Sequence, residues 1–192
     1  MSSNKLYVRG LVWMLIYALA VPALLSGRNV ATARRDPLTE KEADMVREAQ
    51  ALDKRTEVYI KAAERRLLRL TDPNTAASAQ AQKDAEKWGD LKGTRADLLS
   101  DIANILDEAI TNIEDVGTHN SKSGLIPKSI RKLAEASTRF LPQLTALRDE
   151  VKDERERGAL ESAMESMQEI IAAAGKLPAD APETGKPKKR GR

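Results

Sequence analysis

Apolar residues recur every three or four positions through most of this chain, and that spacing limits the folds open to it. Such intervals place the apolar side chains on one face of an α-helix. A half-buried strand would instead alternate apolar and polar residues, and the sequence shows no sustained alternation. The chain is therefore predicted to be all-α, with helices that each bury one face.

The first helix of the body has clear signals at both ends. Thr39 and Glu42 are spaced as a capping box, in which each side chain can accept a hydrogen bond from the other residue's backbone N–H. Apolar side chains then follow one face as far as Leu70, and residues 71–74 (Thr-Asp-Pro-Asn) are typical of a turn. We therefore predict one helix from Thr39 to Leu70, which could bend at the charged residues 53–55.

Three more principal helices are expected further along the chain. They are expected over residues 94–116, 127–151 and 153–174, and each carries an apolar stripe along one face. Pro142 lies inside the second of these stripes and predicts a kink there. A shorter, weakly amphipathic helix is expected over residues 75–88. Short connections between such helices favour an antiparallel bundle of about four principal helices plus this short extra helix.

The N-terminal segment has the pattern of an export signal. Lys5 and Arg9 precede an uncharged apolar run at 11–25, and Ala31-Thr32-Ala33 is a small-x-small motif that a signal peptidase accepts. We predict a signal peptide over 1–33, cleaved after Ala33, and a periplasmic or extracellular mature protein. The alternative is a protein anchored in the membrane by residues 11–25. Because basic residues lie on both sides of the run, the orientation of such an anchor stays open.

Charge divides the rest of the chain into a predicted bundle domain and a tail. Residues 34–175 carry 23 basic and 27 acidic residues, whereas residues 176–192 carry six basic and two acidic residues. The tail is rich in Pro, Gly and Lys and is predicted to be disordered. It is interpreted either as a solubilising end or as an arm for an anionic surface. Its candidate binding residues are Lys186, Lys188, Lys189, Arg190 and Arg192. The overall charge balance gives no argument for specific nucleic-acid binding.

The sequence predicts no catalytic, cofactor or metal site. It contains no Cys, and His119 is its single His. A catalytic nucleophile activated by a histidine base would therefore need His119 as that base. Neither Glu-x-x-His nor a Gly-rich phosphate loop occurs in it. Asp101, Glu108 and Asp115 share one side of a helix, and we interpret them as a solvated flank rather than as an oxygen-lined cation site.

Trp88 is the candidate interaction residue of the body. The helix before it has little else to bury, so Trp88 is expected to dock that helix onto the bundle, with an exposed contact patch as the alternative. Met164 and Met167 lie on the apolar stripe of the last helix. They are interpreted as core residues rather than as an adaptable binding groove.

The segment at 38–50 (LTEKEADMVREAQ) and the amphipathic helices at 127–174 resemble those of secreted, all-helical bacterial proteins of unknown function. The resemblance implies an exported helical protein and carries over no activity. We therefore expect a non-enzymatic envelope or periplasmic module that binds another envelope protein or an anionic surface. The alternative is a bundle that binds a small ligand or cation as a sensor or carrier.

Overall fold

The computed structural model describes residues 35–72, 74 and 78–178. The predicted signal peptide, the alternative anchor at 11–25 and the five basic residues of the tail between 186 and 192 lie outside these ranges. The described part is all-helical, which confirms the predicted fold class. Its elements are α2 (Glu40–Glu48), α3 (Leu52–Thr71), α4 (Ala79–Trp88), α5 (Arg95–His119), α6 (Leu125–Ala146), the short 3-10 helix η3 (Leu147–Asp149) and α7 (Glu154–Gly175).

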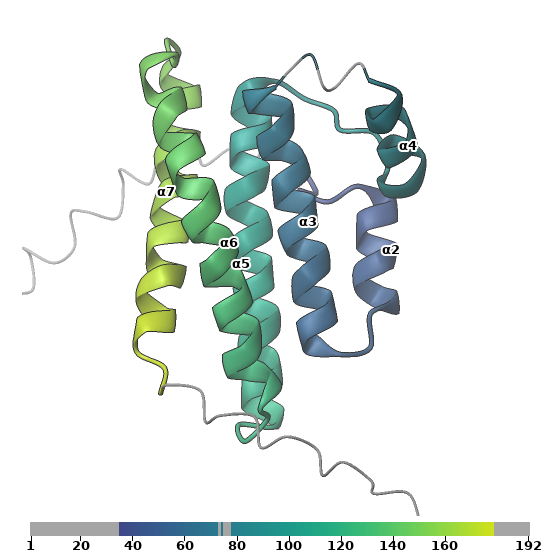
Figure 1. Cartoon of the computed structure of the whole chain (residues 1–192), viewed down its shortest axis with the longest axis vertical. Coiled ribbons are helices and arrows are strands. Elements are labelled where there is room, and N and C mark those ends of the chain that lie inside the picture. The colour runs from purple at the N-terminus through teal and green to yellow at the C-terminus, as the bar shows by residue number, and fades with distance from the viewer. Residues whose placement is uncertain (1–34, 73, 75–77, 179–192) are drawn as a thin grey trace, which may run out of the picture. The chain divides into compact units, whose positions relative to one another are not determined.

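Helices α3, α5, α6 and α7 form a four-helix bundle, and α2 and α4 lie on the outer side of α3 (Figure 1). α3 packs against α5 and α6, and α7 packs against the same two helices from the opposite corner. Arg95, at the start of α5, donates a hydrogen bond to the carbonyl of Leu70 at the end of α3 (3.4 Å), so these two helices are antiparallel. Arg131 near the start of α6 likewise meets Pro178 just after the end of α7, so α6 and α7 are antiparallel as well. Helices that follow one another in the bundle therefore run in opposite directions, and the expected antiparallel bundle with a short extra helix is confirmed.

Two of the four sides of the bundle, α3 with α6 and α5 with α7, are made by parallel helices. Between the first turns of α3 and α6, the Asp53 carboxylate lies 2.8 Å from the Lys128 ammonium group. Between the first turns of α5 and α7, the Asp97 carboxylate lies 2.7 Å from the Arg155 guanidinium. Because α5 and α6 pack against each other only slightly, the short connection between them crosses a diagonal of the bundle.

Aliphatic side chains from all four helices fill the core of the bundle. Met164 and Met167 are among the buried residues, which confirms their interpretation as core. Tyr59 and Phe140 are the buried aromatic residues of this core. The largest apolar side chains that are fully enclosed are Leu67, Leu99, Ile102, Ile105, Leu106, Leu133, Leu144, Leu160 and Met167.

Most helix boundaries follow the local signals in the sequence. The capping box of Thr39 and Glu42 is present as predicted, and Asp153 caps α7 by accepting a hydrogen bond from a backbone N–H. α6 continues through Pro142, so this proline does not end the helix, and the kink expected there stays a prediction. α5 extends to His119, three residues beyond the predicted end at residue 116.

The predicted single helix over 39–70 is wrong, because the chain breaks into α2 and α3 at Ala49–Ala51. The break precedes the charged residues 53–55 at which a bend was expected. In one continuous helix Glu42 and Arg65 would lie about 34 Å apart, at about 1.5 Å per residue. Their side chains instead meet at 2.6 Å, because α2 folds back against α3. No side-chain cap marks the start of α3 at Ala51, so tertiary contacts rather than a local signal account for the break.

Candidate functional site

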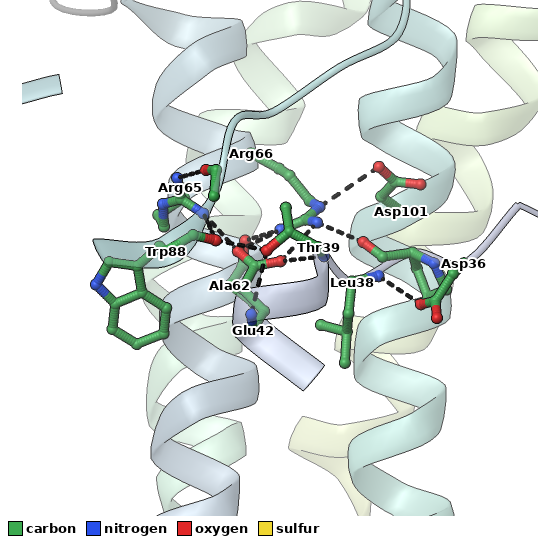
Figure 2. Close-up of polar contacts among 11 residues, drawn as sticks. Asp36, Leu38, Thr39, Glu42, Ala62, Arg65, Arg66, Trp88 and Asp101 are labelled. Atoms are coloured by element: carbon green, nitrogen blue, oxygen red, sulfur yellow. Dashed lines mark hydrogen bonds and ion pairs between the residues drawn. The ribbon is translucent and has the colours of Figure 1, made fainter. Parts of the chain in front are cut away.

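Glu42 is the centre of a buried ionic network between α2 and α3. Its side chain has no exposed surface, and its two carboxylate oxygens accept hydrogen bonds from Arg66 at 2.9 and 3.1 Å (Figure 2). Arg65 donates a further bond to Glu42 Oε1 at 2.6 Å. This two-pronged arrangement is the strongest geometry for an arginine–carboxylate pair. It anchors α2 to the bundle.

Arg66 reaches three other acceptors from the same buried position. It donates to the carbonyls of Ala62 (2.8 Å) and Pro37, and it pairs with Asp101 on α5 at 3.4 Å. Asp101 is buried, so its interpretation as part of a solvated flank is wrong. The periodicity of α5 placed Asp101 beside the apolar stripe, but that position faces Arg66 of α3.

The environment of Glu42 keeps its carboxyl group ionised. Burial alone opposes ionisation and raises the pKa of Glu42. The hydrogen bonds and positive charge of Arg66, with smaller contributions from the Thr39 backbone N–H and from Arg65, outweigh burial. The pKa of Glu42 is therefore lowered from its usual range, and the network holds a charged carboxylate.

The same network connects α2 and α3 to the end of α4. Arg65 donates to the carbonyls of Trp88 (3.4 Å) and Gly89 (2.7 Å), and the Thr39 hydroxyl also donates to the Trp88 carbonyl. Gly89 has a φ of 83°, and a Cβ atom there would lie 2.8 Å from the Thr39 hydroxyl oxygen. The chain can therefore pass this close to Thr39 only with glycine at this position.

The Trp88 ring points away from this network, as Figure 2 shows. It is half-buried and does not belong to the hydrophobic core. The Arg65 guanidinium lies 6.0 Å and the Lys87 ammonium 5.7 Å from the ring centroid, within the range of cation–π attraction. The backbone of Trp88 attaches α4 to α2 and α3, whereas its half-buried ring lies beside the cationic groups of Arg65 and Lys87.

A surface groove of about 290 Å³ lies between α3 and α4. Leu68 lines this groove with 45% of its surface exposed, and it is the only large apolar side chain that is exposed in the described part of the chain. The sequence analysis did not identify Leu68 as a candidate. The feature that could have identified it is that Leu68 is a large apolar residue outside the buried stripe of its own helix. The other lining residues are Arg65, Arg69, Gln80, Ala81, Asp84, Ala85, Asp90 and Leu91.

The remaining candidate residues are not brought together. His119 is exposed at the end of α5, where its Nδ1 atom lies 2.8 Å from the carbonyl oxygen of Asp115. Across residues 35–72, 74 and 78–178, no group of three or more His, Cys, Asp or Glu is placed to hold a metal ion. Within the same ranges, no helix has both the length and the apolar character needed to cross a membrane.

Comparison with known proteins gives no relative from which a role could be transferred. No family model matches the chain, and neither a curated protein nor a solved structure matches it.

Proposed function

We propose that this chain is an exported, non-enzymatic interaction module that binds another envelope protein through the groove between α3 and α4. The exposure of Leu68 in that groove carries the proposal. The other large apolar side chains of the described residues are buried or partly covered, whereas Leu68 lies in a hollow of the surface. Leu68 and Leu91 together give the groove an apolar lining among polar residues, a composition that suits a binding cleft.

The chemistry of the groove indicates what kind of partner it fits. Leu68 and Leu91 offer apolar surface for a side chain of the partner. Arg69 makes no ion pair within the described residues and can receive a carboxylate, while Asp84 and Asp90 supply negative charge at the α4 side. An amphipathic helix that carries one apolar anchor between an acidic and a basic residue fits this pattern.

The envelope location in this proposal rests on the N-terminal sequence. The apolar run at 11–25 and the Ala-Thr-Ala motif that follows support export. A chain without Cys is compatible with an oxidising compartment, because no disulfide can form in it, correctly or wrongly, as it folds.

Crosslinking in envelopes of the native source tests this proposal. The wild-type chain is compared with Leu68→Asp, which places a charge in the groove, and with Gln168→Asp, which places the same charge on the exposed surface of α7. We expect one crosslinked partner that Leu68→Asp loses and Gln168→Asp retains, with unchanged helical circular dichroism in all three chains. The same set of crosslinks from all three chains would rule out this groove as the binding site.

A further inference from the structure

The neighbouring helices α5 and α7 carry acidic residues without basic ones over most of their length. Residues 96–121 contain six Asp or Glu and residues 158–175 contain three, and neither range contains Lys or Arg. Asp97 and Asp101 are neutralised by arginines from elsewhere in the fold. Five others make no ion pair with any described residue: Asp107, Glu114, Glu161, Glu165 and Glu169.

Two of these carboxylates border a groove between α5 and α7. The groove has a volume of about 370 Å³, and Asp107 and Glu169 lie on its rim. Its apolar lining comes from Ile110, Ile170 and Ala173. Such a groove suits a long basic side chain, whose methylene stem can lie on apolar surface while its charged end meets a carboxylate.

The chain itself supplies a basic segment that follows α7, the helix that forms one wall of this groove. α7 ends at Gly175, and the last described residue is Pro178, whose carbonyl accepts a hydrogen bond from Arg131 at 2.5 Å. Residues 179–192 contain five basic and two acidic residues. Eight residues from Pro178 to Lys186 can span up to about 28 Å. Pro178 lies at most about 20 Å from Glu169, because the helix from Glu169 to Gly175 covers about 9 Å and the next three residues add at most about 11 Å. The basic segment is therefore long enough to turn back and reach the groove.

We propose that the basic residues at 186–192 bind in the acidic groove between α5 and α7 of their own chain. The charges are complementary, and attachment to α7 gives the segment a high effective concentration at the groove. The contact is electrostatic and exposed, so salt weakens it. While it is formed, the same cations are withheld from any external anionic surface, and the groove acts as a competitor for the tail. This inference is independent of the groove between α3 and α4.

Paramagnetic relaxation in the full chain tests the contact directly. Because the chain has no Cys, Gly191→Cys gives one site for a nitroxide spin label. We expect amide signals of residues 107–111 and 166–173 to lose about half their intensity or more at low ionic strength, and to recover at about 0.5 M salt. Broadening spread evenly over the bundle, or none, would overturn the proposal.

A charge-matched pair of variants separates the groove from the general charge of the protein. Asp107→Asn with Glu169→Gln removes two carboxylates from the groove, and Glu48→Gln with Glu135→Gln removes two exposed carboxylates from α2 and α6. The broadening should be lost in the first variant and kept in the second. Equal loss in both would contradict a specific groove contact. Broadening of an unlabelled, ¹⁵N-enriched chain by an added spin-labelled chain would show a contact between copies instead and would also overturn the proposal.

Discussion

Glu42 and Arg66 lie 24 positions apart in the chain, yet the Arg66 guanidinium binds both carboxylate oxygens of Glu42 inside the protein. This pair fixes the position of α2, whose other attachments are few. Leu38 and Val46 give partial apolar cover at the edge of the core, and Lys41 donates to the carbonyl of Glu86 in α4. The packing of α2 is thus mainly polar, in contrast to the apolar packing of the bundle.

Replacement of Glu42 by Gln should strongly destabilise the fold. The substitution leaves the buried Arg65 and Arg66 without their main counter-charge, and loss of one partner from a buried pair costs about 3 kcal/mol or more. Denaturant unfolding followed by circular dichroism measures this. Glu48→Gln, at an exposed position of the same helix, is the control and should change the free energy of unfolding by less than about 0.5 kcal/mol. Equal effects of the two substitutions would contradict the assigned role of Glu42.

The ion pairs between α3 and α6 should make stability fall at acid pH. Hydrogen bonds from Lys128 and then Lys132 to the Asp53 carboxylate outweigh its burial and lower the pKa of Asp53 from 3.8 to about 2. A lowered pKa stabilises the fold fully above the unfolded-state value, and this contribution is lost as pH falls through the folded-state value. Because Lys128 is largely exposed, we expect the contribution to be about 1 kcal/mol rather than the full effect of the shift.

This acid dependence is measured by urea unfolding of wild type and Asp53→Asn at several values between pH 5 and pH 2. The difference in stability between them should shrink as the pH falls through this interval. A constant difference would mean that Asp53 does not titrate with a lowered pKa. At the alkaline end, the hydrogen bond to Glu57 raises the pKa of Lys132, so its contribution is present below pH 10.5 and is lost only as pH rises above that value.

Gly89→Ala should weaken the attachment of α4. The substitution places a Cβ atom 2.8 Å from the Thr39 hydroxyl oxygen and forces a non-glycine residue into a positive φ. We expect a loss of about 1–3 kcal/mol in the free energy of unfolding. Gly158→Ala in α7, where nothing lies within 4 Å, should instead stabilise the protein by about 0.5–1 kcal/mol. Thermal unfolding measures both variants. A change of the melting temperature in the same direction for both would refute the close approach of Gly89 to Thr39.

Ser137→Ala should leave the protein as stable as wild type or make it more stable. The Ser137 hydroxyl is fully buried in α6 and has no hydrogen-bond partner within the described residues. An unsatisfied buried hydroxyl costs about 1 kcal/mol or more, and alanine removes that cost while it raises helix propensity. Ser162→Ala, at an exposed position of α7, is the control, because it changes the free energy of unfolding through helix propensity alone. A stability loss of more than about 1 kcal/mol in Ser137→Ala would show that the hydroxyl has a partner.

Helix content and most helix starts could be predicted because their causes are local. Capping side chains such as Thr39 and Asp153 lie within a few residues of the backbone groups that they satisfy. The break between α2 and α3 could not be predicted in this way. Ala49, Gln50 and Ala51 are all compatible with a helix, and only the distant Arg65 and Arg66 make the folded-back arrangement more favourable.

The candidate sites were predicted only in part for the same reason. Trp88 was identified as a notable residue, but its ring and its carbonyl have different roles, and only the structure separates them. Asp101 looked solvent-exposed because the helical pattern of α5 does not show which neighbour faces that side. Leu68 became a candidate only once α4 was placed beside it. The binding role of the basic residues at 186–192 stays a prediction, because these residues lie outside the described ranges.

The start of α3 and the end of α7 lie at one end of the bundle, since Asp53 and the Pro178 carbonyl both contact the first turns of α6, at Lys128 and Arg131. A mechanical load applied between these two points therefore pulls across the helices and not along them. Under such a load the apolar contacts between the helices break one helical turn at a time. A force along the helix axes would instead have to shear the whole length of the apolar core at once.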